Sequence, residues 1–439
     1  MPHNWKTYTV KELIDEKIID KPLDGNHGGT HPKGEDFVSE GIPFVMASDI
    51  NGGNIELINC KFISRNQADK LRKGLSKEGD VLLTHKASIG RTAIVPKIDY
   101  DYIMLTPQVT YYRVLNYDKL DNKYLFQYFN SSTFQNELNM RAGSGSTRAY
   151  IGITDQQMLE VILPPIKEQR AIASILSALD DKIELNLQMN KTLEEMAMAL
   201  YKHWFVDFTP FKSPLEGGTG DVNSEFIDSE LGKIPKGWEV KRLDEIAHKK
   251  SETFNFSGKD EVVFVNTGDV QEGRFLHSNL SPTKGLPGQA KKAISLDDIL
   301  YSEIRPKNKR FAYVNFDSSN YVVSTKFMII NPKKNILSKL LYRILTMQST
   351  VDNFNSIAEG RSGTFPQITF DAIGDIELVL PPMNIQIKFQ ELVGNMELQQ
   401  DELYLETKTL TTLRDTLLPK LISGEVRVKD VEKTISAVL

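Results

Sequence analysis

Two short basic segments contain side chains suited to binding a polyanion. The first follows a predicted strand and contains Thr84, His85, Lys86, Ser88 and Arg91. The second is denser in charge and contains Arg305, Lys307, Asn308, Lys309 and Arg310. Lysine and arginine can neutralise phosphates, arginine can contact guanine edges, and hydroxyl or amide groups can contact other bases. Because both segments lie between corresponding predicted strands, we expect matching contacts to a nucleic acid; solvated surface charge is the alternative.

A second pair of segments is rich in hydroxyl groups and arginine. One contains Arg141, Ser144, Ser146, Thr147, Arg148 and Tyr150, and its counterpart contains Arg361, Ser362, Thr364 and Gln367. We expect both to be surface loops that contact the same ligand. A weaker pair, Ser48, Asp49 and Asn51 with Asn266, Thr267 and Asp269, fits base edges and turns equally well.

Patterns that would indicate catalysis are missing from the sequence. The glycine-rich run at 143–147 lacks the lysine of a phosphate-binding loop. The seven histidines are scattered without zinc-site spacing, and both Pro-Pro pairs follow leucine, unlike the Asn/Asp-Pro-Pro-aromatic motif of adenine methyltransferases. Asp180, Asp181 and Lys182 fit a charged helix face better than a nuclease site. We therefore expect no catalytic residue, no metal site and no cofactor in this chain.

The basic segments correspond because the sequence repeats itself over a long period. Leu163-Pro164-Pro165 recurs 217 positions later as Leu380-Pro381-Pro382, and Ile151 and Glu160 recur at the same offset as Ile368 and Glu377. Solenoid and propeller repeats have periods of about 20 to 50 residues, so this offset predicts two duplicated domains.

Composition indicates a globular protein of a reducing compartment. The 439 residues are 40% hydrophobic and include one cysteine, which excludes an internal disulfide framework. The net charge is −5, and the two windows 166–208 and 383–418 carry an acidic excess that accounts for it. Charge elsewhere sums to zero, which leaves room for basic patches. Neither a membrane span nor a signal peptide is indicated, so we expect a cytoplasmic protein.

The predicted fold class is α/β or α+β, with two duplicated globular domains separated by two long helices. Short strand-like runs at 42–45, 81–84, 92–95 and 109–114 alternate with helical stretches within 119–139. Prolines and glycines at 209–237 are expected to break any regular element there. The predicted boundaries are a first domain at 1–165, a helix at 166–208, a linker at 209–237, a second domain at 238–382, a helix at 383–425 and a tail at 426–439.

Both helices carry a heptad seam, typical of a coiled coil. The first seam includes Leu176, Leu179, Ile183, Asn186, Asn190, Leu193 and Leu200. The second includes Val393, Met396, Gln400, Leu403, Leu410 and Leu417. Each helix could pack on its own domain, but antiparallel pairing would bury both seams, and the polar seam residues would fix its register. Helices of this length span roughly 60 Å.

The helical regions resemble those of a known family. Leu163 to Arg170 (LPPIKEQR), the helix from Ile172 to Phe205 and the segment from Leu413 to Glu425 (LRDTLLPKLISGE) are similar to the spacer regions of type I restriction-modification specificity subunits. The resemblance covers nearly the whole chain but is only architectural in the globular domains. The second helix begins Met383-Asn384-Ile385-Gln386 where the first begins Ile166-Lys167-Glu168-Gln169, so Gln386 is expected to be an approximate match and the two docking surfaces to differ.

The resemblance implies two target recognition domains held by an antiparallel coiled coil that sets the gap between two DNA half-sites. It implies that the chain binds double-stranded DNA and docks two methyltransferase subunits, which use S-adenosylmethionine, with restriction subunits in a full complex. Because the two basic loops differ in composition, we expect the two domains to recognise an asymmetric, bipartite DNA sequence. The main alternative is a scaffold whose duplicated domains bind proteins, and an enzyme acting alone is a third.

Overall fold

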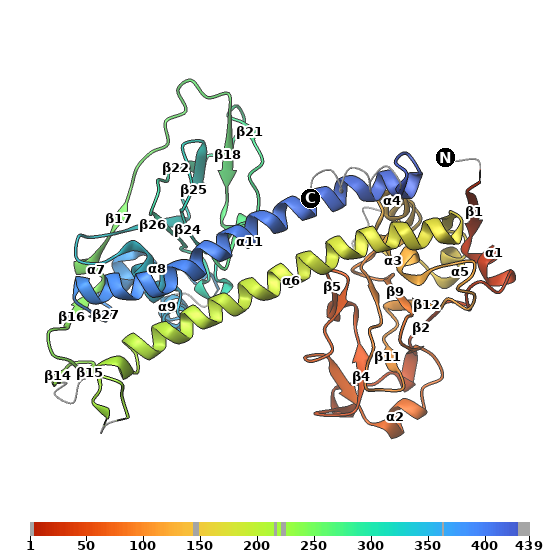
Figure 1. Cartoon of the computed structure of the whole chain (residues 1–439), viewed down its shortest axis with the longest axis horizontal. Coiled ribbons are helices and arrows are strands. Elements are labelled where there is room, and N and C mark those ends of the chain that lie inside the picture. Colours follow the sequence, from red (N-terminus) through yellow and green to blue (C-terminus); the bar gives the residue numbers. More distant parts are fainter. Residues whose placement is uncertain (1–3, 144–148, 215–216, 221–224, 362–363, 429–439) are drawn as a thin grey trace. The chain divides into compact units, whose positions relative to one another are not determined.

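A computed structural model describes residues 4–143, 149–214, 217–220, 225–361 and 364–428. The chain divides into two compact units. The first unit contains residues 1–187 and 404–439, and the second contains residues 188–403. Each unit therefore contains one globular domain together with part of each long helix, α6 (Ile166–Phe205) and α11 (Met383–Ser423) (Figure 1).

The first unit contains two larger sheets, with strand orders β10-β9-β12-β2 and β3-β7-β4-β11-β8, and a pair β1-β13 that leads into α6. Its strands are β1 (Lys6–Thr9), β2 (Leu23–Asp24), β3 (Phe37–Val38), β4 (Ile42–Val45), β5 (Ile50–Asn51), β6 (Asn54–Ile55), β7 (Lys61–Ile63), β8 (Leu75–Ser76), β9 (Val81–Thr84), β10 (Thr92–Ile94), β11 (Ile103–Leu105), β12 (Val109–Tyr112) and β13 (Glu160–Leu163). Its helices before α6 are α1 (Val10–Asp15), α2 (Arg65–Asp69), α3 (Asn122–Asn130), α4 (Ser132–Arg141) and α5 (Ile153–Gln156).

The second unit has sheets of order β17-β26-β23-β24 and β21-β18-β25-β22, and a pair β16-β27 that leads into α11. Its strands are β14 (Phe226–Ser229), β15 (Gly232–Pro235), β16 (Glu239–Arg242), β17 (Ala247–Lys250), β18 (Glu261–Val265), β19 (Val270–Gln271), β20 (Arg274–Phe275), β21 (Ser281–Pro282), β22 (Ala290–Ala293), β23 (Ile299–Ser302), β24 (Phe311–Tyr313), β25 (Tyr321–Ser324), β26 (Phe327–Pro332) and β27 (Glu377–Leu380). Its helices before α11 are α7 (Leu243–Ile246), α8 (Ser338–Thr346), α9 (Gln348–Arg361) and α10 (Phe370–Ile373).

The two domains repeat one plan, which confirms the predicted duplication and the mixed α and β fold class. The parallel pair β4-β11 corresponds to β18-β25, and the antiparallel pair β9-β10 corresponds to β23-β24. All residues of β9 and β23 are buried, which explains why these strands read as continuous apolar runs. The predicted strands at 42–45 and 81–84 have the observed bounds of β4 and β9, whereas β10 and β12 end at Ile94 and Tyr112, before the predicted ends.

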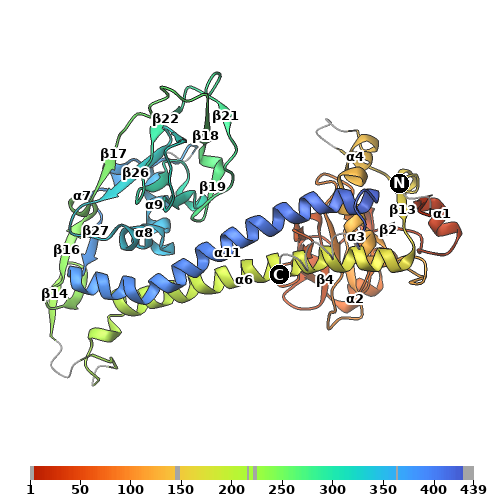
Figure 2. The ribbon, with the colours of Figure 1, turned by 45° about the horizontal axis from the view of Figure 1, so that its top comes forward.

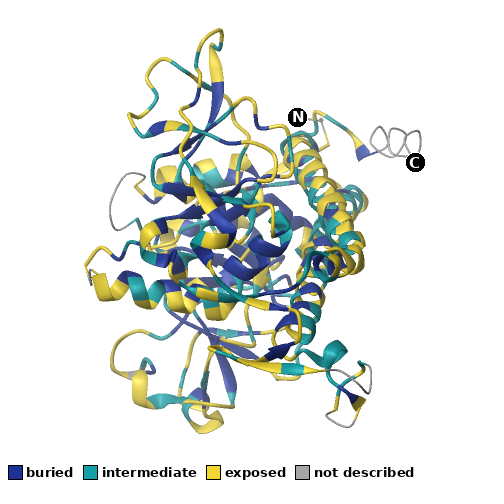
Figure 3. Ribbon diagram, turned by 90° about the vertical axis from the view of Figure 1, so that its left-hand side faces the viewer, coloured by how far each residue is buried: buried dark blue, intermediate teal, exposed yellow. Residues whose placement is uncertain are grey.

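Two helices in each domain link the sheet to the long helices. In the second unit, α8 and α9 lie between β26 and α11 (Figure 2). Residues from these elements and from β23 and β24 form one apolar core. Helices α3 and α4 have the same role in the first unit, where Ile172 and Leu176 of α6 join the core. Buried residues gather in the strands and on the inner faces of these helices (Figure 3). Each long helix therefore does pack on its own domain, as the alternative interpretation of the seam supposed.

The long helices also pair with each other inside each unit, and the order of their contacts makes them antiparallel. In the first unit, Asp180 accepts a hydrogen bond from Arg414 at 3.1 Å, while Asn186 further along α6 donates to Glu406 at 2.8 Å. In the second unit, Gln400 donates to the carbonyl oxygen of Asn190 at 3.2 Å. Each of the thirteen predicted seam residues is buried or half-buried: Leu176, Leu179, Ile183, Asn186, Asn190, Leu193, Leu200, Val393, Met396, Gln400, Leu403, Leu410 and Leu417.

One expectation about the helix starts is wrong. Gln386 lies 217 positions after Gln169, in full register, and the two side chains make the same buried contacts. Gln169 donates to the carbonyl oxygens of Pro164 and Lys119 at 2.8 and 2.9 Å, and accepts from the amide of Asp121 at 3.0 Å. Gln386 repeats this set with Pro381, Asn335 and Leu337. Both glutamines satisfy backbone groups where the helix meets its domain, so they are not available for docking.

The expectation that residues 209–237 contain no regular element is also wrong. Strands β14 and β15 form an antiparallel hairpin there. Phe208 and Phe211 pack edge-to-face on Trp238, with ring centroids 5.5 and 5.0 Å apart. Glycines in this segment permit the turns, and the aromatic contacts supply the burial that orders it. At the other end of the chain, Leu421 and Ile422 of α11 are buried in the core of the first unit.

Candidate nucleic-acid interface

The first basic segment forms the connection between β9 and β10. Lys86 and Ser88 are exposed, and the Lys86 ammonium lies 5.9 Å from the ring centroid of Tyr150. A backbone bridge joins Lys86 to Tyr150, so the two predicted loops of this domain are adjacent. Arg91 is exposed, but its guanidinium already forms hydrogen bonds within the domain. Its Nη1 donates to the carbonyl oxygens of Ile50 and Ala47 at 3.2 and 3.4 Å. The side chains left for a ligand are mainly Lys86, Ser88 and the half-exposed ring of Tyr150.

His85 does not belong to this surface, contrary to its place in the predicted set. It is fully buried, and its Nδ1 lies 3.0 Å from the carbonyl oxygen of Ile151. Burial lowers the pKa of His85, against the opposing effects of that carbonyl and of Asp24. The neutral ring ties the end of β9 to the segment that follows Tyr150. His85 therefore positions the two loops rather than contacting a ligand.

The second pair of loops is only partly described in the first domain. Arg141 ends α4, and its Nε bonds to Glu137 Oε1 at 2.9 Å. Ser144, Ser146, Thr147 and Arg148 lie outside the described residues. The ion pair between Arg141 and Glu137 lies on the surface of one helix and contributes little to stability. Arg141 can therefore exchange Glu137 for a phosphate at small cost.

The second basic segment connects β23 to β24 through a short 3₁₀ turn, Pro306–Asn308. Arg305 and Lys307 are exposed, whereas Lys309 and Arg310 are half-buried. Lys307 lies 3.8 Å from Glu359, and Lys309 lies 3.7 Å from Glu272. These separations between solvated side chains give weak attraction. All four predicted cations thus remain in one loop, and two of them carry a loosely held acidic neighbour.

The counterpart of the hydroxyl-rich loop follows α9. Arg361 is exposed at the end of that helix, Ser362 lies outside the described residues, and Gln367 forms a backbone bridge with Ile304. This bridge repeats the one between Lys86 and Tyr150. Each domain therefore brings its two predicted loops together in the same way.

The third candidate pair has a structural role. Asp49 accepts a hydrogen bond from the amide of Met46 at 2.8 Å, and Asp269 accepts one from the amide of Asn266 at 2.8 Å. Both carboxylates close a turn, which is the alternative that the residue types left open.

Three lysines that the sequence did not single out add positive charge to the second domain. Lys249 of β17, Lys292 of β22 and Lys326 lie close enough to interact, and Glu303 lies 3.6 Å from Lys249. Desolvation, followed by repulsion from Lys249, lowers the pKa of Lys292. Their signal in the sequence is weak, because the three residues come from segments far apart in the chain and only the sheets bring them together.

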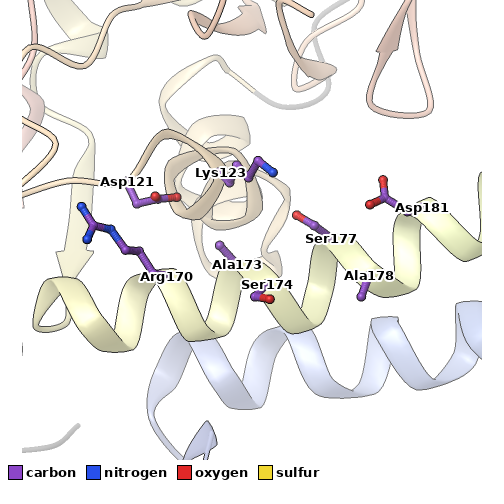
Figure 4. Close-up of a pocket in the computed structure, with 8 residues that line it drawn as sticks. All are labelled: Asp121, Lys123, Arg170, Ala173, Ser174, Ser177, Ala178 and Asp181. Carbon is purple, nitrogen blue, oxygen red and sulfur yellow. The ribbon is translucent and has the colours of Figure 1, made fainter.

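A pocket of about 350 Å³ lies in the first unit, between the start of α3 and α6. Asp121 and Lys123 lie across from Arg170, Ser177 and Asp181 (Figure 4). Asp121 already accepts from the amide of Tyr124 at 3.0 Å, and Arg170 donates to the carbonyl oxygen of Tyr117 at 2.8 Å. Asp121 therefore caps α3, and Arg170 holds the loop before α3 onto α6.

Two searches of the described residues complete the description. Among them, no cluster of three or more histidine, cysteine, aspartate or glutamate side chains is arranged to hold a metal ion. In the same part of the chain, no helix combines the length and apolar composition needed to cross a membrane.

Comparisons with known proteins agree with this architecture. The profile of the type I restriction modification DNA specificity domain matches residues 2–195 and 235–396, so it covers both domains and most of α6. The MjaIX specificity subunit of Methanocaldococcus jannaschii is 28% identical over 98% of this chain and 95% of that protein. The HindI specificity subunit of Haemophilus influenzae is 46% identical, over 40% of this chain and 38% of that protein.

A solved structure has the same fold. The S subunit of a type I restriction-modification system from M. genitalium superposes with a TM-score of 0.57 at 17% identity, over 95% of this chain and 96% of the other. The specificity-domain profile matches the chain twice, once on each of the two similar domains. These two matches account for the repeat in the sequence and for its period. The chain therefore belongs to the family of type I restriction-modification DNA specificity subunits.

Proposed function

We propose that the two domains bind the two halves of an asymmetric, bipartite sequence in double-stranded DNA. The observation that carries this proposal is that equivalent loops, between β9 and β10 and between β23 and β24, combine the same position with different charged residues. The first offers Lys86, Ser88 and Arg91, and the second offers Arg305, Lys307, Lys309 and Arg310. Different side chains on one scaffold would read different bases, so the half-sites should differ.

The chain itself supplies recognition, and its partners supply chemistry. Specificity subunits are non-catalytic as a family, and the relatives are named as subunits of type I restriction enzymes. On this proposal the chain acts in the cytoplasm and docks two DNA methyltransferase subunits, which bind S-adenosylmethionine and modify adenine. Restriction subunits join them in a full complex.

Sequencing of modified bases in host DNA, with and without this gene, tests the proposal directly. The expected result is one bipartite motif that loses its methylation when the gene is removed. If methylation is unchanged and the assembled complex does not retard DNA in a gel shift, the domains do not recognise DNA and a protein-binding scaffold becomes the better interpretation.

The phosphate contacts can be tested separately. Replacing Lys307 and Lys309 with alanine should weaken DNA binding by the assembled complex and flatten its salt dependence by up to about two units, because each phosphate contact contributes about 0.9. The matched control replaces their acidic neighbours, Glu359→Gln and Glu272→Gln, which should strengthen binding. An unchanged slope in the lysine variant rules these residues out as phosphate contacts.

A further inference from the structure

Ala87 and Arg305 occupy the same position in the two domains. The amide of Ala87 donates to the carbonyl oxygen of Ala149 at 3.3 Å, and the amide of Arg305 donates to that of Pro366 at 3.0 Å. The acceptors are 217 positions apart, and each donor directly follows the residue that bridges to the second loop, Lys86 or Ile304. The same two backbone interactions therefore hold Ala87 in the loop between β9 and β10 and Arg305 in the loop between β23 and β24.

The backbone at this position is unusual in both domains. Ala87 has a φ of 66° and Arg305 a φ of 47°, in the left-handed region that favours glycine. A residue with a Cβ pays about 1 to 2 kcal/mol there. The second left-handed position of the loop differs, because it is Gly90 in the first domain and Lys309 in the second. Neither domain uses glycine at the first position, where the direction of the Cβ is fixed by the hydrogen bond and the bridge.

The side chain at this position separates the two domains chemically. Arg305 is exposed, and its guanidinium forms no ion pair or hydrogen bond with any other residue that the structure describes. Its loop neighbours Lys307 and Lys309 each have a glutamate nearby. A guanidinium presents paired donors that match the O6 and N7 acceptors of guanine in the major groove. The methyl group of Ala87 offers no hydrogen bond and can only make apolar contact.

We propose that this position determines specificity: Arg305 reads a guanine in the half-site of the second domain, and Ala87 makes no hydrogen-bonded readout in the other half-site. This inference rests on the proposed DNA recognition. It distinguishes Arg305 from the remaining cations of the loop, which act on phosphates and carry little sequence information.

The test selects binding sites from randomised double-stranded DNA with the complex of this chain and its methyltransferase subunits. Wild type is compared with Arg305→Ala, Arg305→Lys and Ala87→Arg. Alanine already occupies the left-handed position at 87, so Arg305→Ala introduces a residue that this backbone accepts. The half-site of the first domain, selected in the same experiment, reports that the Arg305 variants are folded and assembled.

Arg305→Ala should lose about 10- to 100-fold of its preference for one guanine, while every other position of the motif is kept. Arg305→Lys should keep the salt slope of wild type but lose most of that preference, because a single ammonium cannot make the paired contact. Ala87→Arg should change the preference at one position of the other half-site.

Two results would overturn the inference. The first is an unchanged motif for Arg305→Ala. The second is a uniform loss of affinity over all sequences with a salt slope reduced by about one, which would make Arg305 a phosphate contact. If wild type selects no sequence at all, the proposed function itself fails. If wild type selects a motif and Arg305→Ala leaves that motif unchanged, this inference fails alone, so the two failures are distinguishable.

Discussion

The buried ion network of the second unit makes the sharpest prediction about stability. Arg343 of α8 is 4% exposed, and its Nη2 donates to Glu397 of α11 at 2.8 Å. Lys339 and Gln390 also donate to Glu397, each at 2.8 Å. In the first unit, the corresponding helix contact uses a neutral donor, Gln127, which bonds to Asp180 at 2.8 Å. Among the described residues, this contact therefore uses an ion pair in the second unit and a neutral donor in the first.

Replacing Arg343 with methionine removes one partner of the Glu397 carboxylate, whose side chain is only 13% exposed. Breaking such a pair costs about 3 to 5 kcal/mol. Because Lys339 and Gln390 still donate to Glu397, the lower end, about 3 kcal/mol, is expected. The combined variant Arg343→Met with Glu397→Leu should recover most of this loss, since both deeply placed charges are replaced by apolar side chains of similar volume. Lys339 and Glu194 lose their partners in this variant, but their side chains are 38% and 50% exposed and stay solvated.

Hydrogen exchange of the full chain, followed by mass spectrometry of peptides from α8, measures the effect locally. Protection of α8 should fall by about two orders of magnitude in Arg343→Met, while α3 peptides serve as the internal control. If the free energy of opening of α8 falls by less than about 0.5 kcal/mol, or if the combined variant shows no recovery, the reasoning is refuted. The ion pair between Arg343 and Glu397 would then not contribute to stability.

The same network predicts a pH dependence. Burial alone raises the pKa of Glu397, but hydrogen bonds from Lys339 and Arg343, and their charges, outweigh burial and hold that pKa below its ordinary value of 4.5. A carboxyl with a lowered folded pKa stabilises the fold above its unfolded pKa and loses that contribution as the pH falls through the folded value. Protection of α8 in wild type should therefore decrease below about pH 4.5. Arg343→Met should show a smaller fall in protection over the same pH range, because without the Arg343 guanidinium the folded pKa of Glu397 is lowered less from its unfolded value. An identical profile in both proteins would contradict the assignment.

Three further changes test how the long helices attach to the domains. Gln169→Ala should destabilise the first unit by about 3 kcal/mol, and Gln386→Ala the second, because each leaves one buried and two partly buried backbone groups without this side-chain partner. Exchange protection of α3 or α8 should fall only in the unit that is changed. Ending the chain after Leu417 should open the first unit alone, because Leu421 and Ile422 belong to its core and each contributes about 1.5 to 3 kcal/mol. Limited proteolysis should then cut residues 1–163 and spare the second unit, and equal cleavage of both units would contradict this division.

The sequence by itself determined the duplication, the mixed fold class and the helix seams, and it located the two pairs of candidate loops. These features are periodic or local. A repeat at a constant offset, a seven-residue apolar pattern and a cluster of cations within six positions are all visible without knowing which segments meet. The register of Gln386 is visible in the sequence, because it lies at the same offset of 217 from Gln169. Its burial is not, because a single polar residue at a helix start gives no sign of burial until the loop that it contacts is known.

Only the tertiary structure decided which polar groups remain free for DNA. His85 is buried beside Ile151, Arg91 is partly held by two carbonyl oxygens, and Lys292 interacts with Lys249 and Lys326, which come from other segments of the chain. The equivalence of Ala87 and Arg305 likewise depends on amides that bond to residues about 60 positions away. Burial, repulsion between charges and a left-handed backbone all arise from contacts between distant segments, and a linear pattern of residue types does not encode those distances.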